Sequence, residues 1–198
     1  MRTVNLSETS VEDKAMVKRI GQQAGVNLHN CYQCGKCSAG CPMAEAMDIS
    51  PQQVMRLLQI GRLEEVLQAE SPWVCAQCNT CSSRCPQNID TAAVMREVRR
   101  ASHDTGHHKL HDSNTFETLF IKGIASKGRS NEQYLAAKYN MQSGHFIQDV
   151  FNAPKMFTKN MIGVQAQSSE NPEVIKDLVA RCSAQSPYQT PKEGADQQ

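Results

Sequence analysis

Two runs of cysteine constrain the fold of this 198-residue chain more than any other feature. The first run is CYQCGKCSAGCP, which begins at Cys31, and the second is CAQCNTCSSRCP, which begins at Cys75. Both runs have the same spacing, C-x2-C-x2-C-x3-C, and a proline follows the last cysteine of each. Cysteines two residues apart are poorly placed to form disulfides, and such short loops would gain little stability from cross-linking. The runs therefore predict thiolates that converge on metal centres.

The repeated spacing is the ligand pattern of two-cluster ferredoxins, in which the fourth cysteine of each run binds the cluster of the other run. We therefore expect two [4Fe-4S] clusters. The expected ligands of the first cluster are Cys31, Cys34, Cys37 and Cys85. Those of the second cluster are Cys75, Cys78, Cys81 and Cys41. Zinc is the alternative, but structural zinc sites usually combine two C-x2-C pairs across a longer loop, so the compact runs favour iron and sulfur.

Short polar motifs predict where helices begin. Ser10 with Asp13, and Ser50-Pro51 with Gln53, have the pattern of N-terminal caps. Apolar residues follow at helical spacing, whereas the chain between the cysteine runs holds no alternating β-branched stretch. The expected helices include residues 10–24, 51–60 and 62–68. The sequence therefore predicts a mainly α fold, namely an α-helical ferredoxin domain with helical N- and C-terminal extensions.

The second half of this domain repeats the first. The stretch Ile49-Ser50-Pro51 with Val54-Met55-Arg56 corresponds to Ile89-Asp90-Thr91 with Val94-Met95-Arg96. The offset between these helices is 40 residues (90 minus 50), whereas the cysteines are offset by 44 (75 minus 31). We therefore expect a duplicated unit of loop and helix, with four extra residues after the first loop.

Composition excludes several functional classes. The net charge is +1, and no polybasic tract favours nucleic acid or an anionic membrane. No apolar run approaches the roughly 18 residues of a membrane-spanning helix. The N-terminus has no apolar segment typical of a secretory signal, so we expect a cytoplasmic protein with reduced thiols. Only 39% of the residues are hydrophobic, so binding of clusters or of a partner is expected to contribute to folding.

Four regions are expected along the chain. Residues 1–9 are expected to be a flexible leader, and residues 10–102 the two-cluster domain. Residues 103–182 are expected to be a helical extension that docks a partner, and residues 183–198 a disordered tail that can be removed without loss of a cluster. We expect Cys182 to be a free thiol, because eight other cysteines already complete two four-cysteine sites. The histidine-rich stretch 103–112 favours a solvated loop over an additional metal site.

The motifs favour electron transfer over catalysis. An iron–sulfur cluster with four protein thiolates has no open coordination position at which a substrate could bind. The chain also lacks the sequence signatures of a dinucleotide site, a P-loop or a nucleophile elbow. We therefore expect a relay for single electrons, with no catalytic residue of its own.

Two CxxCxxCxxxCP motifs around a helical spacer, with helical extensions on both sides, resemble the C subunits of heterodisulfide reductases over most of residues 10–160. Similar motifs occur in iron–sulfur subunits of succinate, glycerol-3-phosphate and glycolate oxidoreductases. Those chains add a [2Fe-2S] domain or CCG repeats, whereas here Cys182 is the only cysteine after Cys85. The resemblance implies a non-catalytic subunit of an oxidoreductase complex. It would carry electrons from a flavin-containing A subunit to a CCG-repeat B subunit that reduces a disulfide. The alternatives are an electron-transfer component of another anaerobic dehydrogenase and a diffusible ferredoxin.

Overall fold

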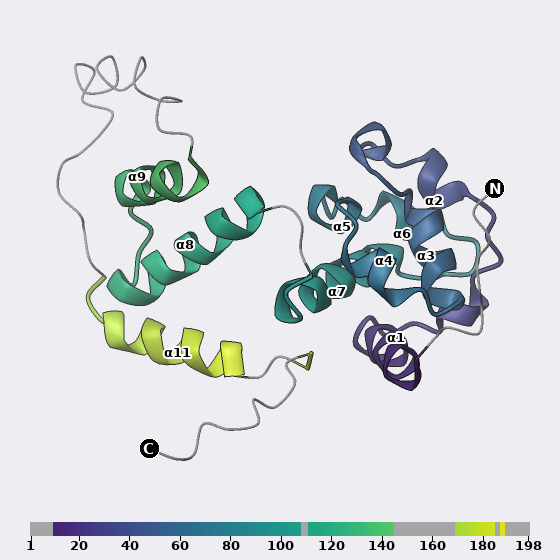
Figure 1. The fold of residues 1–198 in the computed structure, drawn as a ribbon, viewed down its shortest axis with the longest axis horizontal. Coiled ribbons are helices and arrows are strands. Elements are labelled where there is room, and N and C mark those ends of the chain that lie inside the picture. The colour runs from purple at the N-terminus through teal and green to yellow at the C-terminus, as the bar shows by residue number, and fades with distance from the viewer. Residues whose placement is uncertain (1–9, 108–110, 145–168, 185–186, 189–198) are drawn as a thin grey trace. The chain divides into compact units, whose positions relative to one another are not determined.

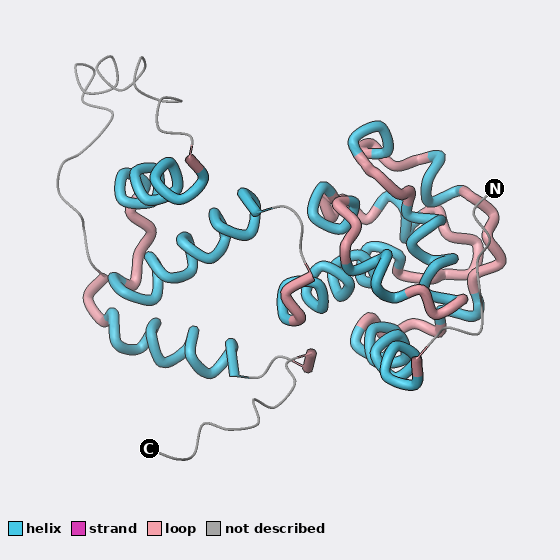
Figure 2. Tube along the Cα trace, viewed as in Figure 1, coloured by secondary structure: helices cyan, strands magenta, loops and turns pink. Residues whose placement is uncertain are grey.

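The computed structural model describes residues 10–107, 111–144, 169–184 and 187–188, and in these ranges the chain contains helices and loops but no strand (Figure 1 and Figure 2). The prediction of a mainly α fold is therefore confirmed. The chain divides into two compact units, of which the first comprises Met1–Lys109 with Tyr188–Gln198 and the second Leu110–Pro187.

The first unit holds both cysteine runs. Its α-helices are α1 (Val11–Gln23), α2 (Lys36–Ala39), α3 (Pro51–Gln59), α4 (Leu63–Leu67), α5 (Ser71–Val74), α6 (Thr80–Ser83) and α7 (Thr91–Asp104). Two 3-10 helices, Leu28–Asn30 and Ala44–Ala46, lie in the connections. The short helices α2 and α6 lie within the cysteine runs, while α3 and α7 follow them, so the sequence repeat is also a structural repeat.

Side-chain caps begin the long helices at the positions that the sequence predicts. Ser10 accepts a hydrogen bond from the backbone N–H of Asp13 at 3.0 Å, and the side chain of Asp13 accepts one in return. Ser50 forms the equivalent capping box with Gln53 at the start of α3. At the start of α7, Asp90 accepts from the N–H of Ala93 at 2.9 Å. These caps stabilise helices that carry the chain into and out of the cysteine loops.

One apolar core supports both loops. It is formed by residues of α1, α3, α4 and α7, among them Ile20, Val54, Leu58, Val66, Val94 and Val98. Cys31, Cys75 and Cys85 are partly buried and pack against this core. Burial of apolar area is the main force that holds helices together, so the core fixes the position of the loops relative to each other.

Tyr188 departs from the expectation of a disordered tail over residues 183–198. Its side chain is 1% exposed and belongs to the core of the first unit. The Tyr188 hydroxyl donates a hydrogen bond to Oε2 of Glu97 at 3.0 Å, and Glu97 is itself 6% exposed. Burial and the adjacent Glu97 carboxylate raise the pKa of Tyr188, so the hydroxyl stays protonated and remains a donor. Residues 185–186 and 189–198 lie outside the described ranges.

The second unit contains the helices α8 (His111–Lys127), α9 (Glu132–Ser143) and α11 (Pro172–Ala184). Helix α8 packs against both α9 and α11. The Phe116 ring stacks on Phe120 at a centroid distance of 6.2 Å and meets Tyr139 edge-on at 5.8 Å. Aromatic side chains of the expected helical extension 103–182 thus pack within this unit, while the part of that extension that falls on residues 145–168 lies outside the described residues.

The histidine-rich stretch 103–112 lies largely between α7 and α8. His103 is in the last turn of α7 and its Nδ1 lies 3.1 Å from Oδ1 of Asp104. His107 Nδ1 lies 2.9 Å from the hydroxyl of Thr105. Residues 108–110 lie outside the described ranges. His103 and His107 therefore both have local polar neighbours.

Asp48 connects the exit of the first cysteine loop to the entrance of the second. Its Oδ1 accepts from the backbone N–H of Ser71 at 2.9 Å, and its Oδ2 accepts from that of Glu70 at 3.0 Å. Burial favours a raised pKa for Asp48, but hydrogen bonds from Ser71 and Glu70 outweigh it, so the pKa lies below its ordinary value of 3.8. The carboxylate thus caps α5 from a segment more than twenty residues away in sequence.

Replacing Asp48 with alanine is expected to lower the free energy of unfolding by about 1–2 kcal/mol at pH 7. Because the pKa of Asp48 is lower in the folded than in the unfolded protein, its carboxylate stabilises the fold at pH values above the unfolded-state pKa. This stabilisation is lost as the pH falls through the folded-state pKa. The gap between wild type and Asp48→Ala should therefore close below about pH 4. Denaturant unfolding at a series of pH values measures this difference in the free energy of unfolding. Asp177→Ala on α11, which removes an exposed pair with Arg181, is the control and should change stability by less than about 0.5 kcal/mol. Equal effects of the two variants would contradict the role of Asp48.

Candidate iron–sulfur centres

Both cysteine runs fold into the same local conformation. Gln33 and Gln77, which occupy equivalent positions, have φ angles of 65° and 53°. Gly35 and Asn79 follow with φ angles of 80° and 60°, at the start of α2 and α6. Two left-handed residues among three cysteines turn the chain sharply, which lets a short loop direct several thiols inward. At Gly35 a side chain would also crowd Gln52, because a Cβ there would lie 3.2 Å from Oε1 of Gln52.

Each run lines an internal cavity together with one cysteine of the other run. The first cavity is lined by Cys31, Cys34, Cys37 and Cys85. The second is lined by Cys75, Cys78, Cys81 and Cys41. The structure therefore brings the eight predicted site residues together in the two groups that the spacing predicts, with the fourth cysteine of each run beside the other run. Cys182, on α11, is exposed.

The chemistry of the two cavities fits an iron–sulfur cluster. Their walls are largely apolar, with Met55 and Ile89 beside the first cavity and Met47 and Met95 beside the second. Within the described ranges, no three Cys, His, Asp or Glu side chains are close enough to bind a single metal ion. Thiolates around one zinc ion lie within about 4 Å of each other, since Zn–S bonds are about 2.3 Å, whereas a four-iron cluster holds them further apart. Four thiols on an apolar wall fit the larger group.

Matched hydrogen bonds hold the cysteine loops against the helices that follow them. The hydroxyl of Ser38 accepts from the backbone N–H of Gln52 at 2.9 Å, and that of Ser82 accepts from the N–H of Ala92 at 3.0 Å. Helices α2 and α6 also contact each other. At this contact Gly40 lies against the guanidinium of Arg84, its equivalent in the other run, and a side chain at Gly40 would have to displace this flexible arginine. This close approach lets Cys41 and Cys85, the next residues, reach across.

The protonation of the thiols depends on their position in the run. Burial raises the pKa of Cys37 and of Cys81, the third cysteine of each run. The Thr80 hydroxyl, 3.3 Å from the sulfur, lowers the pKa of the exposed Cys78. Lys36, at the position equivalent to Thr80, is exposed. Since only thiolates bind iron, metal binding at these sites is expected to release protons. The metal should lower the pKa most at the partly buried Cys37 and Cys81.

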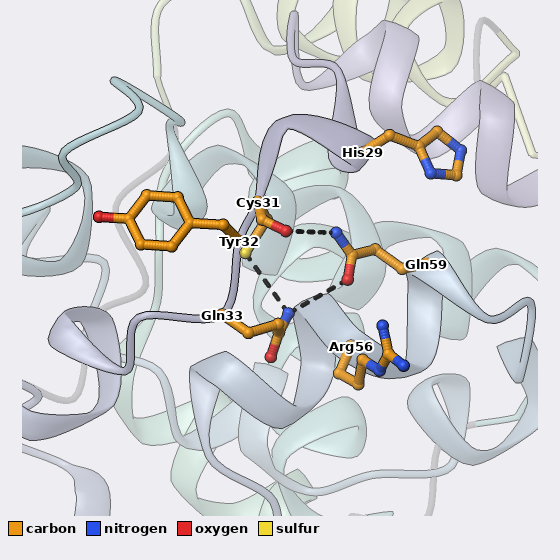
Figure 3. A pocket seen from close by; sticks show the side chains of 6 residues that line it. All are labelled: His29, Cys31, Tyr32, Gln33, Arg56 and Gln59. Carbon is orange, nitrogen blue, oxygen red and sulfur yellow. Dashed lines mark hydrogen bonds between the residues drawn. The ribbon is translucent and has the colours of Figure 1, made fainter.

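Two glutamines donate to cysteine sulfur, a role that the cysteine spacing alone does not predict. Nε2 of Gln33 lies 3.4 Å from Sγ of Cys31, and Nε2 of Gln77 lies 3.5 Å from Sγ of Cys75. Figure 3 shows the first of these bonds and Gln59, which donates to the Cys31 carbonyl at 2.7 Å and accepts from Gln33 at 3.3 Å. The shared C-x-Q-C pattern of the two runs is the signal that could have revealed these residues.

Removing either glutamine is expected to lower the reduction potential of one centre. A donor to thiolate sulfur stabilises the more negative, reduced cluster. In protein reconstituted with iron and sulfide, Gln33→Leu should therefore lower the potential of the centre at Cys31, and Gln77→Leu that of the centre at Cys75. The expected shift is up to about 60 mV, which equals a tenfold change in a one-electron equilibrium. Redox titration followed by electron paramagnetic resonance measures it. Each variant is the control for the other, and unchanged titrations in both would contradict the assignment.

Comparison with known proteins agrees with this site. A family model described as a 4Fe-4S dicluster domain matches residues 27–89, which contain all eight cysteines of the two cavities. The iron–sulfur C subunit of CoB–CoM heterodisulfide reductase from Methanopyrus kandleri is 30% identical over 82 residues, 41% of this chain and 43% of that protein. The C subunit of the ferredoxin:CoB–CoM heterodisulfide reductase from Methanosarcina acetivorans is 34% identical over 90 residues, 45% of this chain and 36% of that protein.

A third relative aligns over more of the chain. The C subunit of the H2:CoB–CoM heterodisulfide,ferredoxin reductase from Methanothermobacter thermautotrophicus is 27% identical over 105 residues, 53% of this chain and 57% of that protein. The chain thus spans about half the length of these relatives. The resemblance that the cysteine motifs indicated is confirmed: the chain contains a 4Fe-4S dicluster domain and is a relative of the iron–sulfur C subunits of heterodisulfide reductases.

Proposed function

We propose that this chain is the electron-relay subunit of a heterodisulfide reductase-type complex. When bound, two [4Fe-4S] clusters would supply one-electron chemistry. Cys31, Cys34, Cys37 and Cys85 would hold one of them, and Cys75, Cys78, Cys81 and Cys41 the other. The observation that carries the proposal is the crossed pairing of the cysteines around two separate cavities. Because four thiolates would fill every external position of each cluster, the residues of this chain hold and insulate the centres and leave substrate chemistry to a different protein of the complex.

The proposed partners follow from the relatives, whose names describe them as C subunits of reductases that act on the CoB–CoM heterodisulfide. We propose a flavin-containing donor that resembles the A subunits of such complexes. The proposed acceptor is a CCG-repeat protein that resembles their B subunits and reduces a disulfide, and all three proteins would lie in the cytoplasm. In the described ranges, none of the helices combines the length and apolar character that crossing a bilayer would require.

Residues 103–182 are proposed to dock one of these partners. Support comes from apolar and aromatic side chains that remain exposed on the helices of the second unit, among them Phe116 and Tyr134, which is 44% exposed. Exposed aromatic residues are enriched in protein interfaces.

Anaerobic purification of the tagged full chain from its own cells tests the proposal. We expect about eight iron atoms per chain, the resonance signals of two reduced [4Fe-4S] centres, and a co-purifying CCG-repeat protein. The isolated chain should accept electrons from an artificial donor but should not reduce a disulfide. Stoichiometric zinc with little iron would refute the clusters. Loaded clusters without any stable partner would favour a diffusible ferredoxin instead, and a different dehydrogenase in the complex would favour the other alternative.

A further inference from the structure

Two adjoining surface hollows lie beside the first cysteine run. They have volumes of about 670 and 690 Å³ and share His29 and Gln59 in their walls. Figure 3 shows the smaller hollow, which reaches Cys31 and Gln33. Both of these residues also line the internal cavity of the first centre. The outer hollow and the first centre therefore share a wall, and a partner seated there would lie next to the Cys31 thiolate.

The charges around the hollows are of one sign. Lys14 and Lys18 lie one turn apart on α1 and line the larger hollow, while Arg56 on α3 lines the smaller one. All three side chains are exposed. Among the described residues, no aspartate or glutamate lines either hollow, and no carboxylate pairs with any of these three cations. The charged residues that line the hollows are thus cations, although the chain as a whole has a net charge of only +1.

The larger hollow also offers apolar surface between its cations. Val17, Val26 and Ile60 are partly exposed in its wall. Tyr32, 57% exposed, stands at the smaller hollow directly after Cys31. A patch of apolar and aromatic side chains within a basic rim has the composition of a protein-binding surface for a partner with acidic side chains.

We propose that this face, defined by Lys14, Lys18, Arg56 and Tyr32, docks an acidic electron-transfer protein that exchanges electrons with the first centre. The inference rests on the proposed relay function and adds to it the point of entry and the chemistry of the partner. The transfer would be a single-electron step: the reduced partner would lose one electron, the cluster held beside Cys31 would gain it, and no bond would be formed or broken. The cations attract the partner's carboxylates and increase the rate of productive encounter.

The test measures electron transfer from a reduced, acidic two-cluster ferredoxin to the reconstituted full chain by stopped-flow absorbance. In the variant Lys14→Glu/Lys18→Glu/Arg56→Glu, the second-order rate constant at low ionic strength should fall about tenfold or more. The wild-type rate constant should fall as salt is added, whereas that of the variant should not. The two rate constants should therefore converge at high salt. Tyr32→Ala should slow transfer without changing the salt dependence.

The matched control is Lys122→Glu/Lys138→Glu/Lys176→Glu, which makes the same change in charge on helices outside the hollows. These helices belong to the region proposed to dock a partner subunit of the complex, and no such subunit is present in this assay. Its rate and salt dependence should stay near those of wild type. Full reduction by dithionite, followed by resonance spectroscopy, must show both centres intact in every variant. A wild-type rate in the first variant, or equal slowing in the control, would overturn the docking face while leaving the relay function standing. Absence of clusters from the wild-type chain would instead overturn both.

Discussion

Replacing Cys85 with alanine is expected to damage the cluster bound by Cys31, Cys34 and Cys37, although Cys85 lies in the other run. The reason is that Cys85 lines the cavity of the first run, and an alanine would leave that cluster with three protein ligands. The cluster of Cys75, Cys78 and Cys81 should keep its fourth ligand, Cys41. Cys41→Ala should have the opposite effect. In each variant, iron content should fall from about eight atoms per chain towards about four or to a three-iron form at one site.

Matched variants identify which cluster is affected. Cys34 and Cys78 are the exposed second cysteines of the two runs. Replacing either of them with alanine should damage the cluster of its own run, so these two variants provide reference spectra. In paramagnetic resonance, Cys85→Ala should resemble Cys34→Ala, and Cys41→Ala should resemble Cys78→Ala. Cys182→Ser, which changes an exposed cysteine outside both cavities, should keep two normal clusters. If Cys85→Ala instead resembled Cys78→Ala, each run would bind its own cluster and the crossed arrangement would be refuted.

The second large effect is expected at Tyr188. Tyr188→Ala should lower the free energy of unfolding of the first unit by about 3–5 kcal/mol, because it opens a cavity in the core. It also removes the hydroxyl that donates to the buried Glu97. Tyr188→Phe keeps the ring and removes only the donor, so it should cost about 1–3 kcal/mol. Anaerobic denaturant unfolding, followed by cluster absorbance and circular dichroism, measures both.

Tyr134→Ala is the control for this effect, because Tyr134 is an exposed tyrosine on α9. It should change stability by less than about 1 kcal/mol. Truncation after Ser183 removes Tyr188 and should destabilise the first unit at least as much as Tyr188→Ala. The expectation drawn from sequence is only that the tail can be removed without loss of a cluster, so a loss of stability would be an effect that the sequence did not indicate. A truncated chain with wild-type stability would show that the contact between Tyr188 and Glu97 contributes nothing.

Local interactions explain which parts of the fold are predictable from sequence. The caps at Ser10 and Ser50 involve residues within a few positions of each other, so their pattern predicts their structure. The same holds for the helical spacing of apolar residues. The expected helices 51–60 and 62–68 accordingly differ from α3 (Pro51–Gln59) and α4 (Leu63–Leu67) by no more than one residue at each end.

Three other relations between distant residues were decided by the tertiary structure alone. Glu97 and Tyr188 are 91 residues apart, and a single tyrosine in a polar tail has no periodicity that could reveal its burial. Asp48 caps α5 across more than twenty residues, a distance at which no capping motif exists in the sequence. The face of Lys14, Lys18 and Arg56 arises because residues of α1 and α3, which are far apart in the sequence, line the same adjoining hollows.

The sequence by itself determined that this is a helical chain with two four-cysteine motifs of iron–sulfur type, because ligand spacing and helix caps are properties of short segments. The spacing also predicts which thiols share a cavity, whereas the tertiary structure decided which glutamines reach their sulfurs and how Tyr188 joins the core. The physical reason is that these relations depend on how helices pack. Packing is selected by the burial of apolar surface over the whole unit and leaves no short pattern in the chain.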